Sequence, residues 1–113
     1  MIGMLGRRTK HTIDVVEALA GHRAGLLTLV DVRGEGERAR GHVQRSLHIP
    51  LADIKSRLGE LSPNRPVAFI CQSGRRSAMA ATAARRAGLD ARNVDGGMQA
   101  WAARQLPIEK ESA

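Results

Sequence analysis

The sequence contains very few cysteine and aromatic residues. Cys71 is the only cysteine, Phe69 and Trp101 are the only aromatic side chains, and there is no tyrosine. A single cysteine excludes an intramolecular disulfide and any metal site built from several cysteines. We therefore expect a protein of a reducing, cytoplasmic compartment, with no metal and no cofactor.

Long hydrophobic runs are also missing. Residues 1–8 contain no apolar region of the length that a signal peptide needs. No stretch approaches the roughly 18 apolar residues of a membrane span. These absences predict a soluble protein that does not act at a membrane.

Acidic residues are scarce relative to basic ones, 11 against 18, which gives a net charge of +7. The basic residues are spread from Arg7 to Lys110, and two aromatic side chains offer almost no platform for base stacking. We do not expect nucleic acid as a primary partner. A general attraction for small anions explains the charge more simply.

A chain of 113 residues has the length of one domain, and its pattern alternates strands with helices. We expect strands at 26–32, 46–49, 67–70 and 91–94, with a faint one at 10–13. Helices are expected at 14–21, 53–58, 77–87 and 98–104. The polar, glycine-containing segment 33–41 is predicted to be a connection without regular structure. This alternation predicts an α/β fold with a mainly parallel sheet.

Cys71 stands at the end of the expected strand 67–70, before a loop that leads into the helix 77–87. In parallel sheets, ligands bind beyond the carboxyl ends of the strands. Loop N–H groups at the positive end of a helix favour the thiolate form of cysteine. Gly74 allows a tight turn, and Arg75 and Arg76 add charge that could hold an anion. The alternative is a small buried hydrophobic residue, which explains neither Gly74 nor the paired arginines.

The segment 71–77, Cys-Gln-Ser-Gly-Arg-Arg-Ser, resembles the active-site loop Cys-x-x-Gly-x-Arg-Ser of the rhodanese sulfurtransferases. Four further segments resemble this family in the right order: 29–33 (Leu-Val-Asp-Val-Arg), 37–43 with Glu37 and Gly-His-Val, 46–50 (Ser-Leu-His-Ile-Pro) and 94–101 with Gly-Gly and Trp. The resemblance covers 12–107. It leaves 1–11 as an N-terminal extension and 108–113 as a C-terminal tail.

The resemblance implies a single rhodanese-like domain, with about five strands in a central sheet and helices on both faces. The Cys71 thiolate would attack the outer sulfur of an anionic donor such as thiosulfate, releasing sulfite and leaving a persulfide. An acceptor, either cyanide or a thiol of a small molecule or protein, would then take that sulfur. The loop would bind substrate through its backbone and cations, namely Gln72, Ser73, Gly74, Arg75 and Arg76.

Four further residues are expected to support the site rather than to react. Asp31 and Arg33 are expected to form an ion pair or hydrogen-bond network, because a buried charge generally needs a partner. His42 is expected to be structural, since sulfur transfer to a thiolate needs no general base. Ser77 follows the loop at the start of the helix.

Other positions carry structural expectations. Gly96 and Gly97 should form a tight turn, and Trp101 and Met79 should lie in the core. Arg38 replaces the aromatic residue that many family members have at this position, which could add a cation near the site.

Two other functions fit parts of the pattern. Related folds use a cysteine-and-arginine loop as phosphatases or arsenate reductases, but with five residues between these two side chains where Cys71 and Arg76 have four. Some rhodanese domains have lost the cysteine and serve as interaction modules, whereas this chain keeps it.

Overall fold

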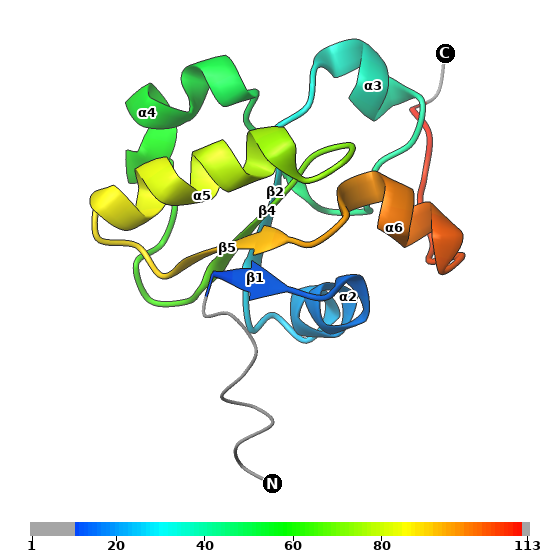
Figure 1. The fold of residues 1–113 in the computed structure, drawn as a ribbon, viewed down its shortest axis with the longest axis horizontal. Helices are drawn as coiled ribbons and strands as arrows, with labels where there is room; N and C mark the ends of the chain where they lie inside the picture. The colour runs from blue at the N-terminus through cyan, green and yellow to red at the C-terminus, as the bar shows by residue number, and fades with distance from the viewer. Residues whose placement is uncertain (1–10, 112–113) are drawn as a thin grey trace, which may run out of the picture.

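The computed structural model of the chain describes residues 11–111. Its centre is a five-stranded sheet in the order β1-β5-β4-β2-β3, with every neighbouring pair parallel (Figure 1). The strands are β1 (Thr12–Ile13), β2 (Thr28–Asp31), β3 (Leu47–His48), β4 (Val67–Ile70) and β5 (Ala91–Val94). The strands β4 and β5 have the predicted bounds, whereas β2 and β3 are shorter than the predicted 26–32 and 46–49. The expected α/β fold class is confirmed.

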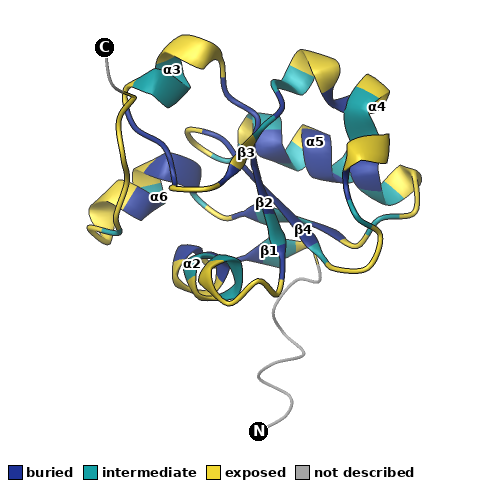
Figure 2. Cartoon of the chain, turned by 180° about the vertical axis from the view of Figure 1, so that it is seen from behind, coloured by how far each residue is buried: buried dark blue, intermediate teal, exposed yellow. Residues whose placement is uncertain are grey.

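Helices cover both faces of the sheet (Figures 1 and 2). One face carries α2 (Val15–Arg23) and α6 (Gly97–Ala103). The other carries α5 (Arg75–Arg86) and α4 (Ile54–Arg57), the latter flanked by two short 3₁₀ turns, η1 (Leu51–Asp53) and η2 (Leu58–Glu60). A short helix, α3 (Glu35–Ala39), follows β2.

The alternation of side chains along β4 determines which face Cys71 occupies. All four residues of β4 are buried, as expected for a strand inside a parallel sheet. Val67 and Phe69 pack in the core beneath α5, whereas Ala68 and Ile70 pack in the core beneath α2 and α6. Cys71 continues the first series and belongs to the core beneath α5.

Small side chains let α5 lie close to the sheet. Ala80, Ala81 and Ala84 of this helix are fully buried against the sheet. Met79 is 63% exposed, so the prediction that it lies in the core is wrong. Met79 precedes the buried pair at 80 and 81 and lies outside the alanine stripe that faces the sheet. Trp101 is fully buried on the other side, as predicted, and its indole N–H donates to the carbonyl oxygen of Pro107 at 3.0 Å.

The first helix runs further than predicted. Asp14 caps it as expected, accepting from the N–H of Val16 at 2.7 Å. Gly21 does not end the helix, which continues to Arg23. A Cβ atom at Gly21 would lie 2.7 Å from Leu27 Cδ2, so this glycine makes room for a buried leucine.

Two elements near the site also differ from the predictions. The polar connection 33–41 contains α3, whose first turn is closed by the Glu37 carboxylate accepting from the Gly34 N–H at 3.1 Å. The helix α5 begins at Arg75, two residues early, because Gly74 (φ +107°) already serves as its N-cap.

The ends of the described chain are partly tied to the domain. Of the faint strand at 10–13, Thr12 and Ile13 pair with β5, and Lys10 lies outside the described residues. Glu109 forms an antiparallel bridge with His42, so this part of the predicted tail lies against the domain. Within 11–111, no helix is long and apolar enough to cross a membrane.

Candidate functional site: a cysteine loop at the end of β4

The sulfur of Cys71 is surrounded by hydrogen-bond donors. The backbone N–H groups of Gly74 and Ser77 lie 3.1 and 3.4 Å from Sγ, and the Ser77 hydroxyl lies 3.2 Å from it. The cysteine itself is only 1% exposed. Gln72 and Ser73, the next two loop residues, are exposed. The loop thus encloses one sulfur atom at the N-terminal end of α5.

The first turn of α6 orients this loop. The N–H of Met98 donates to the Cys71 carbonyl at 2.8 Å, and the N–H of Gln99 donates to the Gln72 carbonyl at 3.0 Å. Because each peptide unit is planar and trans, the N–H on the other side of these carbonyls points away from α6. The peptide that joins Gln72 to Ser73 therefore directs its N–H away from α6, and this Ser73 N–H is one of the hydrogen-bond donors to the Cys71 sulfur.

The predicted Gly96-Gly97 turn is confirmed, with φ of +76° and +56°. A Cβ atom on Gly97 would overlap the Cys71 carbonyl oxygen and lie 2.8 Å from that of Gln72. Glycine is needed here so that α6 can approach the loop backbone.

Burial of the Cys71 thiol opposes its ionisation, but the hydrogen bonds offset this effect. The donors are the hydroxyl and N–H of Ser77, followed by the N–H groups of Gly74 and Ser73. Together they hold the pKa of Cys71 below its ordinary value. The loop is therefore built to favour a thiolate.

The two loop arginines have different environments. Arg76 forms a two-bonded ion pair with Glu37, at 2.8 and 2.9 Å. This pair lowers the pKa of Glu37 from 4.5 to about 2 and raises the pKa of Arg76. The Arg75 side chain is exposed and makes no ion pair or hydrogen bond with the described part of the chain.

The ion pair expected between Asp31 and Arg33 is present and buried. Arg33 donates to the Asp31 carboxylate from Nε at 3.0 Å and from Nη2 at 2.9 Å, and also to the Gly41 carbonyl at 2.6 Å. Arg38 lies 3.3 Å from the same carboxylate and donates to the Ser46 carbonyl at 2.7 Å. One carboxylate cannot neutralise two arginines, so Arg38 does add a positive charge to this cluster, held against Asp31 and Ser46.

His42 lies apart from the sulfur and is held at both ring nitrogens. Nδ1 is 3.0 Å from the Arg38 carbonyl oxygen, and Nε2 is 3.2 Å from a carboxylate oxygen of Glu109. These contacts connect α3 to the segment that follows α6. They fit the structural role expected for His42.

Asn93 is a site residue that the sequence analysis missed. Its side-chain N–H donates to the Gly74 carbonyl at 3.0 Å, and its oxygen lies 2.5 Å from the Ser77 hydroxyl. A signal was available, because Asn93 alternates with Ala91 and so faces the α5 side of the sheet. A polar side chain in that apolar series needs a hydrogen-bond partner.

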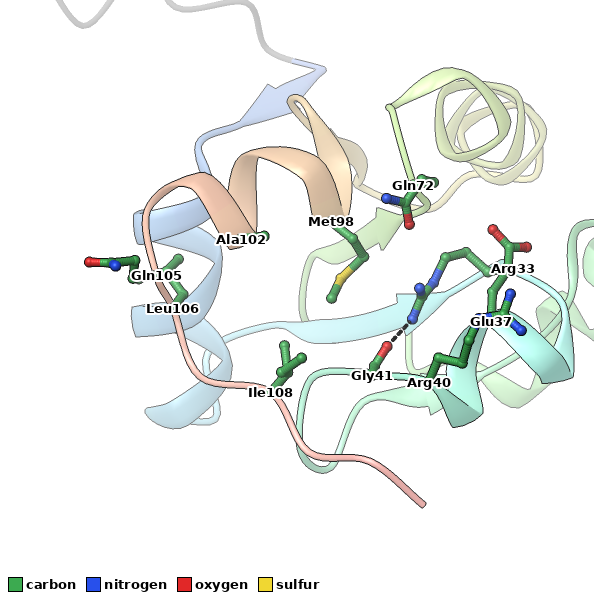
Figure 3. A pocket seen from close by; sticks show the side chains of 10 residues that line it. All are labelled: Arg33, Glu37, Arg40, Gly41, Gln72, Met98, Ala102, Gln105, Leu106 and Ile108. Carbon is green, nitrogen blue, oxygen red and sulfur yellow. Dashed lines mark hydrogen bonds between the residues drawn. The ribbon is translucent and has the colours of Figure 1, made fainter. Parts of the chain in front are cut away.

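A pocket of about 510 Å³ opens beside the loop (Figure 3). Gln72 borders it, although Cys71 does not. Charged side chains of Arg33, Glu37 and Arg40 form one side, and Figure 3 shows Met98 of α6 facing them. The remaining lining residues are Gly41, Ala102, Gln105, Leu106 and Ile108. Within 11–111, no three His, Cys, Asp or Glu side chains are grouped so that they could hold a metal ion.

The fold and loop together define a class: a parallel α/β domain that encloses a cysteine sulfur in backbone N–H donors at the end of a central strand. The family model described as "Rhodanese-like domain" matches residues 14–104. The chain belongs to this family. The matched segment falls inside the predicted domain 12–107.

The chain is also similar to individual named proteins. The chain is 37% identical over 81 residues to a protein named "Sulfurtransferase" from Allochromatium vinosum, covering 71% of this chain and 76% of that one. It is 37% identical over 101 residues to the HTH-type transcriptional regulator Rv0324 of Mycobacterium tuberculosis, covering 87% of this chain. The match spans only 44% of that regulator.

Among solved structures, a rhodanese-related protein from Thermoplasma volcanium superposes with a TM-score of 0.82 at 28% identity. That match covers 89% of this chain and 99% of the other.

Proposed function

We propose that this protein is a sulfurtransferase that carries sulfane sulfur as a persulfide on Cys71. The observation that supports this most directly is the set of three donors within 3.4 Å of the cysteine sulfur. The relative named "Sulfurtransferase" from Allochromatium vinosum points in the same direction. A free cysteine that must stay reduced fits a reducing, cytoplasmic compartment.

The proposed reaction has two half-reactions. The Cys71 thiolate attacks the outer sulfur of thiosulfate, the bond between the two donor sulfurs breaks, and sulfite leaves with the electron pair. The negative charge then lies on the outer sulfur of the persulfide, where loop N–H groups from Gln72 to Gly74 can stabilise it. A thiol or cyanide acceptor attacks that sulfur and restores the thiolate.

The acceptor must come from another molecule, because the chain has no second cysteine to form a disulfide with Cys71. The pocket bordered by Gln72 is large enough for a molecule bigger than thiosulfate. We place the acceptor there, either a small thiol or the end of a partner protein.

Phosphatase or arsenate reductase activity is the alternative enzyme function. Against it, Arg76 is already paired with Glu37 and the loop has four residues between Cys71 and Arg76. A tetrahedral oxyanion needs a wider ring of donors than a single sulfur does. The interaction-module alternative does not explain why the donors converge on a sulfur atom.

The deciding experiment is intact-mass measurement of the purified protein after incubation with thiosulfate. We expect a gain of one sulfur atom that is absent from Cys71→Ser and that is lost when a thiol acceptor is added. The same samples are assayed for hydrolysis of an aryl phosphate. A folded protein without any sulfur gain would favour the interaction module, and Cys71-dependent phosphate hydrolysis would favour the phosphatase.

A further inference from the structure

The Ser77 hydroxyl lies between two hydrogen-bond acceptors. Its oxygen is 3.2 Å from Cys71 Sγ and 2.5 Å from Asn93 Oδ1. A hydroxyl group carries one proton, so it can donate to only one of these atoms at a time. Ser77 is fully buried, and a hydroxyl without an acceptor would be costly there.

The orientation of the Asn93 amide is fixed by its other contact. The Gly74 carbonyl can only accept, so the group 3.0 Å from it must be the Asn93 NH₂. The amide oxygen therefore faces Ser77 and can only accept a hydrogen bond from it. Asn93 and the cysteine sulfur compete for the same proton.

The geometry points to a two-position switch: we infer that Asn93 is a positioning residue that holds the Ser77 proton whenever the Cys71 sulfur carries no charge, and releases it when that sulfur is a thiolate. This inference rests on the proposed function, because it describes how the Ser77 hydrogen bond changes partner as the charge on the Cys71 sulfur changes during sulfur transfer.

Each step of the cycle then has a defined hydrogen-bond pattern. In the free thiolate, Ser77 donates to Sγ alongside the N–H groups of Gly74 and Ser77. In the persulfide, the charge moves to the outer sulfur and the inner sulfur becomes a weak acceptor, so the Ser77 proton turns to Asn93. When the acceptor removes the outer sulfur, the proton returns and stabilises the departing thiolate.

The charged groups around the cysteine loop are the same in each of these states. They are Arg75 and Arg76 of α5, Glu37 and Arg38 of α3, Arg40 after α3, Asp31 and Arg33 at the end of β2, and Asp95 after β5, while α6 has no titratable residue. Substitutions at Asn93 and Ser77 leave all of them in place. A change in the pKa of Cys71 between such variants therefore reports the neutral hydrogen bonds.

The test is the pH dependence of Cys71 alkylation by iodoacetamide, which gives the pKa of the thiol without any sulfur donor. We expect Ser77→Ala to raise this pKa, because the thiolate loses a donor. Asn93→Ala should lower it by about 0.5 to 1, the size of one neutral hydrogen bond, because the competing acceptor is gone. In Ser77→Ala/Asn93→Ala the effect of the asparagine should vanish.

Asn64→Ala is the matched control, since Asn64 is exposed in the loop at the opposite end of β4. Thermal unfolding of each variant establishes that it is folded. In the unsubstituted protein, the ¹³Cγ chemical shift of Asn93 should titrate together with Cys71, and in Ser77→Ala it should not. This second measurement needs no Asn93 variant.

Three results would overturn the inference. The first is a raised Cys71 pKa in Asn93→Ala, and the second is an equal change in the Cys71 pKa on Asn93→Ala whether or not Ser77 is present. The third is a ¹³Cγ chemical shift of Asn93 that does not change as Cys71 titrates. The second result would mean that Asn93 acts by holding the Gly74 carbonyl. Failure of sulfur loading would refute the proposed function but leave these measurements valid.

Discussion

Arg75 and Arg76 are neighbours in the sequence and differ sharply in what they contact. Arg76 is held by two hydrogen bonds to Glu37, whereas Arg75 is exposed and has no partner in 11–111. An arginine already bound to a carboxylate has little capacity left for a substrate anion. The structure therefore assigns different environments to Arg76, which matches the arginine of the motif, and to Arg75, which falls on an unspecified position of it.

At this scale we predict different kinetic effects of the two arginines. Arg75→Ala should raise the KM for thiosulfate several-fold and change the KM for an uncharged sulfane-sulfur donor much less, because only an anion loses an attraction. Arg76→Ala should lower the free energy of unfolding and reduce the rate of sulfur transfer from both donors to a similar extent, because Glu37 loses its partner. Steady-state kinetics with both donors and urea unfolding check this.

Arg86→Ala is the control, because it removes an exposed charge at the far end of α5. An equal rise in KM for the charged and the uncharged donor in Arg75→Ala would contradict an anion-holding role.

At the scale of elements, the conformation of the cysteine loop depends on its contacts with α6. The first turn of α6 binds the carbonyls of Cys71 and Gln72, and Gly97 permits this approach. Two segments about 25 residues apart thus form one unit, with β5 between them in the sequence.

We predict that Gly97→Ala destabilises the protein by at least about 2 kcal/mol, because φ is +56° and the new Cβ would overlap carbonyl oxygens of the loop. The measurement is urea unfolding at pH 7. The same variant should alkylate at Cys71 with an altered pH profile, since the loop must shift.

Gly59→Ala is the matched control, because nothing lies within 4 Å of a Cβ atom at Gly59. It should change the free energy of unfolding by less than about 0.5 kcal/mol. A Gly97→Ala protein as stable as this control would show that α6 does not pack on the loop as described.

The exposed position of Met79 on α5 gives a second prediction at this scale. Met79→Gln should alter the free energy of unfolding by less than about 0.5 kcal/mol, as is usual at the surface. Ala81→Leu, on the buried face, should cost about 1–3 kcal/mol through overpacking. Urea unfolding of both variants compares the two faces of α5. A large decrease in the free energy of unfolding of Met79→Gln would show that Met79 packs in the core.

At the scale of the whole molecule, the ion pair between Glu37 and Arg76 joins α3 to α5 across 39 positions of sequence. It fixes the segment after β2 against the helix after β4. Both elements border the cysteine loop, so the pair also fixes the shape of the site.

We predict that this pair makes stability depend on pH in acid. The pKa of Glu37 falls from 4.5 to about 2 on folding, so the folded state binds fewer protons than the unfolded state between these values. Its contribution is complete above pH 4.5 and is lost as the pH falls toward 2. Because both side chains are about one-third exposed, we expect only about 1 kcal/mol.

Glu37→Gln should therefore be less stable than the unsubstituted protein at pH 7, and the difference should shrink at pH 3. Urea unfolding at both values measures this. Glu60→Gln, which removes an ion pair whose carboxylate is more exposed than that of Glu37, is the control and should have a smaller effect. A difference that stays constant from pH 7 to pH 3 would contradict a role for the Glu37 charge.

Local pattern was sufficient for the bounds of β4 and β5, the cap at Asp14 and the place of Cys71, because these depend on residues close together in the chain. It failed at Gly21, where a distant leucine needs the space, and at α3, which is too short to show helical periodicity. It also failed at Met79, since the face that α5 presents depends on where the helix meets the sheet.

The sequence by itself therefore determined the parallel α/β fold, the cysteine at a strand end and the family resemblance, all of which follow from short-range periodicity and motif spacing. Only the tertiary structure decided which arginine is free, how α6 turns the loop peptides, and that Asn93 reaches Ser77. These facts depend on contacts between β4, β5, α3, α5 and α6, and no local pattern encodes the distances between them.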